Sequence, residues 1–322
     1  MLKFRLYGAP VAHSYSPLFQ DAGFASLGVQ GTYVAEEVDT AGLREAAQRV
    51  RVGAVRGANI TLPWKREALA LADTASTWAM RLGVANTWWT ERAGVLHASN
   101  TDVHGVEAML DRLGEAQGRS MQRALLLGTG GAARAVLGAM LSRGMDVVVV
   151  GRRREALEGV LAWGRGHESG AAGRVRGVPW SEEACAGAWV AQTELVVDAT
   201  SLALQEHEEA ARAYRVVPWD ALPPTCRVWD LSVSASPTHI ARRAASAGLY
   251  ATDGAYMLLV QGALACRLWT EEQPSWSAIE GVLATALQRG SIGKEPSHAW
   301  WTASYRAERR QVRSGVCASE SF

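Results

Sequence analysis

The sequence predicts an α/β protein of two domains, and three observations support this. Its 322 residues are 48% hydrophobic and 20% charged, which is typical of a soluble globular chain long enough to build two separate cores. Short β-like runs alternate with helical patterns over the first hundred residues, and a second strand–helix–strand pattern begins at Arg123. This order predicts mostly parallel sheets covered by helices, with strand ends that face a crevice.

Apolar runs and helix-start residues place the elements of the first hundred residues. Ser16-Pro17 and Asp39 are typical first residues of helices, and Pro63 is expected to end a strand. In chain order, we expect a strand at 3–7, a helix at 18–27, a strand at 32–38, a helix from 39 to 50, a strand from 57 and a helix at 66–72.

The rest of the chain opens with an apolar strand from Arg123 that runs through a glycine-rich loop into a helix ending near Gly144. Residues 155–191 are rich in Gly, Ala and Arg and indicate no clear element. The tail at 290–322 is predicted to be either a docked helix or an unstructured extension. The remaining expected elements are strands at 146–150, 195–201 and 228–231, and helices at 256–269 and 276–288.

Charge and composition exclude several function classes. Lys and Arg number 33 and Asp and Glu 32, so the net charge of +1 gives no basic excess for binding nucleic acid. The apolar stretch Gly254–Cys266 is shorter than the ~20 residues of a membrane-spanning helix, and the N-terminus has no signal-like apolar region. We expect a cytoplasmic monomer or homodimer. No C-x-x-C pair suggests a metal site or disulfide framework among the four cysteines, Cys185, Cys226, Cys266 and Cys317.

The glycine-rich loop at 128–135 lies between a predicted strand and a predicted helix, which is the context of a dinucleotide site. Gly128, Gly130, Gly131 and Ala132 would let the chain turn tightly and let a pyrophosphate approach the helix N-terminus. The alternative is a glycine turn that only packs a helix against a strand. The loop therefore indicates a dinucleotide without proving one.

The residues after the next strand favour NADP over NAD. An NAD site usually carries an acidic residue there, whereas this chain has Arg152, Arg153 and Arg154. Planar guanidinium groups bind phosphate oxygens in pairs, so they suit the 2′-phosphate of NADP. A solvated run of charge is the alternative, with Glu155 placed to neutralise one arginine.

Seven motifs, in this order, resemble those of the shikimate dehydrogenase family, and the resemblance covers about residues 2–290. They are Ser14-x-Ser16-Pro17, Gly57-Ala-Asn59-Ile-Thr61-x-Pro63-x-Lys65, Ala85-Asn86-Thr87, Asn100-Thr101-Asp102, the Gly128 loop, Ala199-Thr200-Ser201 and Asp253-Gly254-x-x-Met257-Leu258-x-x-Gln261. The resemblance implies NADPH-dependent reduction of 3-dehydroshikimate, a small-molecule substrate, to shikimate in the shikimate pathway.

The resemblance also implies the roles of individual residues. Lys65 and Asp102 would be the catalytic pair, with Lys65 as general acid/base. The other substrate-binding residues would be Ser14, Ser16, Thr61, Asn86 and Gln261; the cofactor-binding residues would be Gly128, Gly130, Gly131, Ala132, Arg152, Arg153, Arg154, Thr200, Ser201 and Gly254. A substrate domain would span 1–103 and 256–290, a Rossmann-type NADP domain 104–255, and an extension of unknown role 291–322.

Three residues depart from the family pattern. Val233 stands where the family usually has a pocket tyrosine, Asp198 replaces the asparagine before Ala-Thr-Ser, and Ala203 replaces a glycine. We expect Asp198 to point away from the cofactor or to contact a ribose hydroxyl, because a carboxylate would repel a pyrophosphate. Val233 and Asp198 keep open the alternative of a paralogue acting on quinate or another shikimate-like ring. A catalytically silent NADP-binding regulator on the same fold is a further alternative.

Overall fold

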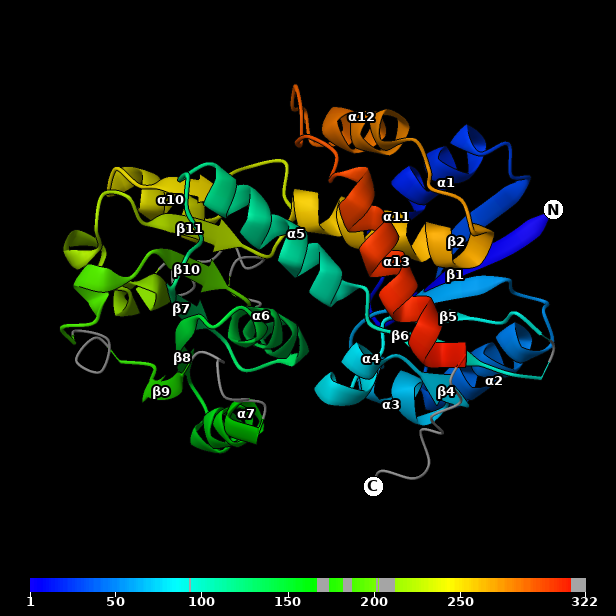
Figure 1. Cartoon of the computed structure of the whole chain (residues 1–322), viewed down its shortest axis with the longest axis horizontal. Helices are drawn as coiled ribbons and strands as arrows, with labels where there is room; N and C mark the ends of the chain where they lie inside the picture. Colours follow the sequence, from blue (N-terminus) through cyan, green and yellow to red (C-terminus); the bar gives the residue numbers. More distant parts are fainter. Residues whose placement is uncertain (93, 167–173, 182–186, 201, 203–211, 314–322) are drawn as a thin grey trace. The chain divides into compact units, whose positions relative to one another are not determined.

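The computed structural model describes residues 1–92, 94–166, 174–181, 187–200, 202 and 212–313. The chain divides into two compact units, each built on its own six-stranded sheet (Figure 1). Unit 1 comprises Met1–Gly105 and Leu258–Phe322, and unit 2 comprises Val106–Met257. The predicted α/β class is confirmed.

The sheet of unit 1 has the order β2-β1-β3-β5-β6-β4 and is mixed. Strand β5 runs antiparallel to both β3 and β6, while the other pairings are parallel. The strands are β1 (Leu2–Gly8), β2 (Gly31–Glu37), β3 (Gly57–Ile60), β4 (Thr74–Ala75), β5 (Thr87–Trp89) and β6 (His97–Ser99). The helices are α1 (Ser16–Ser26), α2 (Thr40–Arg51), α3 (Lys65–Ala70), α4 (Thr77–Leu82), α12 (Trp276–Ala286) and α13 (His298–Arg313).

Helix α2 illustrates how local sequence fixes an element of unit 1. The Asp39 carboxylate accepts a hydrogen bond from the N–H of Gly42 at 2.8 Å, as an N-cap does. The apolar residues of α2 recur at helical spacing and are buried in one core cluster with Ile60 and Trp88. The helix therefore covers the sheet through its apolar face.

Unit 2 contains an all-parallel sheet with the order β12-β11-β10-β7-β8-β9. In order of appearance this is the 3-2-1-4-5-6 arrangement of a Rossmann fold, with the reversal of strand order between β7 and β10. The strands are β7 (Arg123–Leu127), β8 (Asp146–Gly151), β9 (Val175–Pro179), β10 (Leu195–Asp198), β11 (Arg227–Asp230) and β12 (Tyr250–Thr252). The helices are α6 (Gly131–Ser142), α7 (Arg154–Gly166) and α10 (His239–Ser246), with short 3-10 turns at 190–192, 214–216 and 219–221.

Several predicted boundaries were wrong. The strand expected to end at Pro63 ends at Ile60, because the chain turns there and the N–H of Trp64 donates to the carbonyl of Thr61. Strand β10 ends at Asp198 rather than at 201. Ser16 is the first helical residue and not the N-cap, which is Tyr15. The segment 155–191 contains most of α7 and all of β9.

Two helices, α5 (Asp102–Glu115) and α11 (Ala255–Thr270), have residues in both units. The tail forms helix α13, which contacts β4 and β6 of unit 1, so of the two expectations for this segment the docked helix is confirmed over 298–313. None of the described helices is long and apolar enough to cross a membrane.

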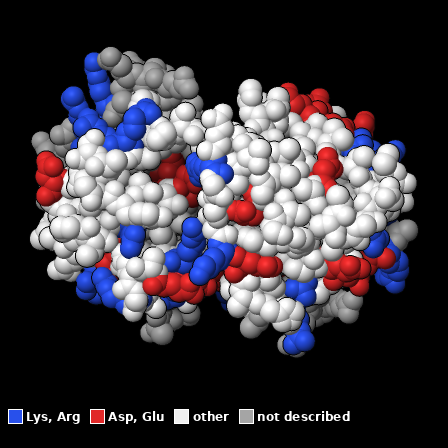
Figure 2. All heavy atoms as spheres, turned by 90° about the horizontal axis from the view of Figure 1, so that it is seen from above, with Lys and Arg blue, Asp and Glu red and all other residues white. Residues whose placement is uncertain are grey.

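On the face shown in Figure 2, small groups of Lys and Arg and of Asp and Glu are scattered among uncharged residues. Cys226 and Cys266 are buried free thiols, while Cys185 and Cys317 lie outside the described residues. Among the described residues, no group of three His, Cys, Asp or Glu side chains could hold a metal ion.

Candidate active site

The sheet of unit 1 brings its predicted site residues to one edge. Strands β1 and β3 are parallel, and β6 has the same direction because both β3 and β6 oppose β5. The ends of β1, β3 and β6 and the start of β5 therefore meet at the same edge. The residues near that edge are Ser14 and Ser16 after β1, Thr61 and Lys65 after β3, Asn86 before β5, and Asp102 after β6.

Lys65 and Asp102 form the central contact of this edge. The Lys65 Nζ lies 2.6 Å from the Asp102 Oδ2, and the two side chains are only 18% and 15% exposed. Lys65 is the first residue of α3 and Asp102 the first residue of α5, so both side chains project from ordered helical backbone. A partly buried lysine held by a carboxylate can donate a proton to a substrate oxygen.

Thr101 joins two further predicted residues. Its N–H donates to the Asn86 Oδ1 at 2.8 Å, and its hydroxyl donates to the Gln261 Oε1 at 3.3 Å. All three side chains are buried. The structure thus connects Asn86 and Gln261 through the residue next to Asp102. Thr101 lies within one of the seven motifs, but the sequence does not predict its place in the site, because its partners are 15 and 160 residues away along the chain.

The loops that carry Ser14 and Thr61 pack together beside Gly8. A Cβ at Gly8 would lie 2.4 Å from the Thr61 Cγ2 and 2.9 Å from the Leu62 carbonyl oxygen, so only glycine fits. The Ser14 Oγ accepts a hydrogen bond from the N–H of Ser16 at 3.1 Å. Ser14, rather than Ser16, thus supplies the hydroxyl that fixes the chain before α1.

In unit 2, the glycine loop lies at the switch point between β7 and β10. Gly128 has a φ of +113°, and a Cβ there would lie 2.9 Å from the Ala199 carbonyl oxygen. A Cβ at Gly130 or Gly131 would meet nothing within 4 Å. Of the three glycines of this loop, the fold itself therefore requires only Gly128. The other two, at the N-terminus of α6, which has no side-chain cap, leave the backbone open to a phosphate group, which fits a dinucleotide.

The three arginines after β8 differ in their surroundings. All are exposed, but the Arg154 Nε pairs with the Glu158 Oε1 at 2.7 Å. The carboxylate that neutralises one of the three arginines is therefore that of Glu158, one helical turn after Arg154 in α7, rather than that of Glu155. Arg152 and Arg153 form no ion pair with the described residues, so they are the better candidates for a phosphate.

The remaining predicted cofactor residues have structural roles of their own. A Cβ at Gly254 would lie 2.1 Å from the Leu231 carbonyl oxygen, so backbone packing after β11 already requires glycine there. Thr200 follows β10 and donates its N–H to the Asp198 Oδ1 at 2.9 Å. Ser201 and Ala203 lie outside the described residues.

Asp198 points into the interior of unit 2. Its carboxylate is fully buried and also accepts a hydrogen bond from the Tyr214 hydroxyl, which agrees with the first of the two expectations for this side chain. Burial, and then the neighbouring Asp230 carboxylate, raise the pKa of Asp198 to about 7. Asp230 is buried too and accepts from the Thr238 hydroxyl at 2.6 Å. Burial likewise raises the pKa of Asp230.

This buried carboxyl predicts a pH dependence of stability. The pKa of Asp198 is higher in the folded chain, about 7, than its ordinary value of 3.8, so its stabilising proton is lost as the pH rises toward 7. Wild type should lose stability from pH 5 to pH 8 as Asp198 loses its proton, whereas Asp198→Asn has no carboxyl to titrate there. The free energy of unfolding of the variant, relative to that of wild type, should therefore be about 2–3 kcal/mol higher at pH 8 than at pH 5. Urea titrations at both pH values measure this difference.

Asp220→Asn, at an exposed residue of the same unit, is the matched control. Burial lowers the pKa of His97 to about 4, which has the opposite sign, but that titration is common to all three proteins and cancels in the comparison. An equal pH dependence in wild type and Asp198→Asn would contradict the assignment.

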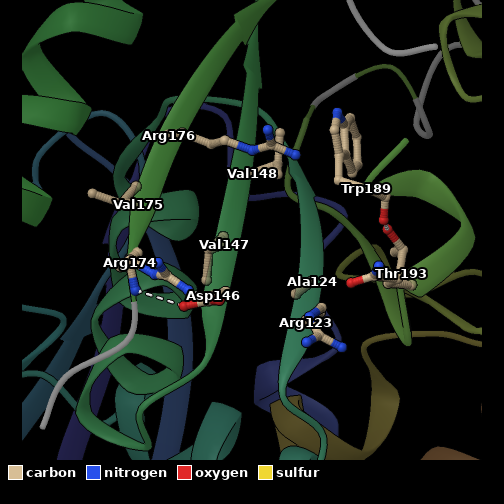
Figure 3. Close-up of a pocket in the computed structure, with 11 residues that line it drawn as sticks. Arg123, Ala124, Asp146, Val147, Val148, Arg174, Val175, Arg176, Trp189 and Thr193 are labelled. Carbon is tan, nitrogen blue, oxygen red and sulfur yellow. Dashed lines mark hydrogen bonds and ion pairs between the residues drawn. The ribbon is translucent and has the colours of Figure 1, made fainter. Parts of the chain in front are cut away.

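A large pocket of unit 2, of about 510 Å³, lies at the other edge of its sheet (Figure 3). Arg123 and Asp146, the first residues of β7 and β8, line it, and Arg176 lies 4.9 Å from the Trp189 ring centroid. Rossmann-type sheets bind ligands at the carboxyl ends of their strands. This pocket is therefore separate from the glycine loop.

A Rossmann-type sheet with a glycine-rich loop at its switch point is typical of nicotinamide-dependent α/β oxidoreductases, and the Lys65–Asp102 pair of the other unit could supply the proton donor that such a reaction needs. Comparisons with known proteins are more specific. The family model described as the shikimate dehydrogenase substrate binding domain matches residues 6–88.

Two curated relatives are named shikimate dehydrogenase (NADP(+)). One from Thermus thermophilus is 35% identical over 89% of this chain and 99% of its own length, and one from Brucella abortus is 33% identical over 88% and 95%. A crystal structure of a Thermus thermophilus shikimate 5-dehydrogenase, in complex with NADP(H) and shikimate, is 33% identical with a TM-score of 0.73, covering 89% of this chain and all of that one. The chain belongs to the shikimate dehydrogenase family.

Proposed function

We propose that this chain is an NADP-dependent oxidoreductase that reversibly reduces 3-dehydroshikimate to shikimate, a step of aromatic amino-acid biosynthesis. The observation that carries the proposal is the 2.6 Å contact between Lys65 and Asp102, in a chain of this family. An inactive regulator would have no need to keep a partly buried proton donor and its carboxylate partner. We further propose that the protein is located in the cytoplasm and that it is a monomer or a homodimer.

The two units would divide the work. The substrate domain would comprise residues 1–103 and 256–290, most of which belong to unit 1, and the NADP domain residues 104–255. Gly130 and Gly131 leave room for the pyrophosphate at the start of α6, and Arg152 and Arg153 would bind the 2′-phosphate. Bound NADPH would supply the hydride that adds to the carbonyl carbon of the substrate.

The chain's own residues would manage the proton and the pose of the substrate. Lys65 would donate a proton from its Nζ to the ketone oxygen and stabilise the developing negative charge, while Asp102 holds the ammonium in place. In the reverse direction Lys65 takes the hydroxyl proton back. The residues that would bind the carboxylate and ring hydroxyls are Ser14, Ser16, Thr61, Asn86 and Gln261.

A direct assay tests the proposal. Purified protein with 3-dehydroshikimate is expected to oxidise NADPH, and with shikimate to reduce NADP. The absence of NADPH oxidation with 3-dehydroshikimate would refute it. Turnover of quinate instead would favour the paralogue alternative, and NADPH binding without turnover of any of these rings would favour the regulator.

Quinate is tested as a substrate because Val233 stands where the family usually has a pocket tyrosine. Val233 lies in the segment after β11, where a tyrosine would add a phenolic hydroxyl. Losing one hydrogen bond to a charged group costs about 1.5–3 kcal/mol, which weakens shikimate binding by about ten- to a hundredfold. The nearby Ser234 hydroxyl is a possible substitute for the phenolic hydroxyl, but its Oγ already accepts a hydrogen bond from the N–H of Ser236 at 3.3 Å. We expect Val233→Tyr to lower the KM for shikimate by this factor, measured by steady-state kinetics, and an unchanged KM would contradict it.

A further inference from the structure

The C-terminal helix α13 lies outside the motifs shared with the family but against the segment that carries Asp102. It runs beside β6 in Figure 1 and contacts both β4 and β6. Several aromatic contacts hold it in place. Trp301 is buried and lies 6.5 Å from Trp276 between ring centroids, and the Tyr305 ring centroid lies 4.5 Å from the Arg267 guanidinium.

Glu308, on this helix, is fully buried and holds two residues at once. Its Oε1 lies 2.7 Å from the His104 Nε2, and its Oε2 accepts a hydrogen bond from the Ser99 hydroxyl. Ser99 is the last residue of β6, and His104 lies in the first turn of α5. The carboxylate thus ties together the two ends of a short segment, 99–104.

The residues between those two ends belong to the candidate active site. Thr101 contacts Asn86 and Gln261, and Asp102 contacts Lys65. The Asn100 Oδ1 accepts from the N–H of Asp102 at 3.2 Å, which holds the turn between strand and helix. A shift of this turn would move the Asp102 carboxylate relative to the Lys65 ammonium.

Burying a carboxylate is costly unless its oxygens are partnered, and apolar residues often pack a helix at least as well. A helix that only covered the sheet would therefore not need Glu308. Its two contacts end on either side of the catalytic segment, which points to a function in fixing that segment.

We propose that Glu308 is a positioning residue: it holds segment 99–104 so that Asp102 keeps its contact with Lys65. The tail helix would thereby complete the active site from outside the part of the chain that the family shares. This inference rests on the proposed function only for its kinetic consequence, since the fixing of the segment can be measured without turnover.

The kinetic test replaces Glu308 with Gln, which keeps the shape and removes the charge. A misplacement of a catalytic group by about 1 Å can cost a hundredfold. We expect kcat to fall by about tenfold or more, while the KM for NADPH stays within about twofold. Arg306→Gln, at an exposed residue of the same helix, is the control and should match wild type.

A double-variant cycle separates positioning from general damage to the fold. If Glu308 acts through Asp102, then Glu308→Gln should cost little further activity in an Asp102→Asn background. Equal losses in both backgrounds would overturn the proposal, as would wild-type kinetics of the single variant. If Glu308→Gln folds poorly, Ser99→Ala removes one of the two contacts with a smaller change and is expected to lower kcat in the same direction.

Hydrogen exchange keeps the test independent of the activity. Peptides that cover 99–104 are expected to exchange faster in Glu308→Gln than in wild type, whereas peptides from unit 2 should not change. Unchanged exchange at 99–104 would refute the positioning role even if the wild type is active. An inactive wild type with faster exchange in the variant would refute the proposed function alone.

Discussion

Replacing Lys65 with Ala is expected to lower kcat for 3-dehydroshikimate reduction by about two orders of magnitude or more, with cofactor affinity almost unchanged. The ammonium lies 2.6 Å from the Asp102 carboxylate, and alanine leaves neither a donor nor a charge for the developing alkoxide. Lys65 lies in unit 1, whereas the glycine-rich loop proposed to bind the dinucleotide lies in unit 2. The variant should therefore bind NADPH as the wild type does.

Steady-state kinetics and a fluorescence titration with NADPH measure the two quantities separately. Lys3→Ala, at an exposed lysine of β1, is the matched control. Because Lys65→Ala leaves Asp102 without its cation, a thermal melt must show that the variant is folded at the assay temperature. A kcat near that of the wild type would mean that another residue moves the proton.

The second large effect concerns the choice between NADPH and NADH. We expect the wild type to prefer NADPH strongly and the double variant Arg152→Ala, Arg153→Ala to lose most of that preference. Each charge-assisted hydrogen bond to a phosphate contributes about 1.5–3 kcal/mol, so the KM for NADPH should rise by about a hundredfold or more. NADH lacks the 2′-phosphate, and its kcat/KM should change by less than about threefold.

Steady-state kinetics of the wild type and of the double variant, each with NADPH and with NADH, measure these changes. Arg165→Ala, an exposed arginine at the end of α7, controls for the loss of positive charge. Arg154→Ala should have a smaller effect than the double variant, because Glu158 already engages Arg154. Comparable kcat/KM values of the wild type with NADPH and NADH would contradict the arginine assignment.

Long, strongly patterned elements of this fold were predictable from the sequence. Helix α2 has a capping aspartate and a regular apolar face, and the strand–loop–helix at Gly128 has a distinctive glycine pattern. The short strands β4, β5 and β6 were missed. Strand β5, for example, has three residues that are all buried, so it shows no alternation between apolar and polar positions. Its antiparallel direction makes the sheet mixed.

The candidate site was predictable as a set of residues but not as a network. Lys65 and Asp102 lie in separate motifs, and only the pairing of β3, β5 and β6 brings them together. Nothing in the local sequence indicates the contacts that Thr101 and Glu308 make, because their partners are distant along the chain. Asp198 departs from the family pattern in the sequence, but nothing in the spacing indicates that Tyr214 is its partner.

The glycine loop has a consequence for chains of this fold that have lost their dinucleotide. Gly128 is held by its φ of +113° and by the Ala199 carbonyl, neither of which depends on a ligand. Gly130 and Gly131 have no such internal constraint. In a relative that no longer binds a dinucleotide, we therefore expect glycine to be kept at the position of Gly128 and to be replaced by residues with side chains at the positions of Gly130 and Gly131. The residues at these last two positions would then distinguish chains that bind the dinucleotide from chains that do not.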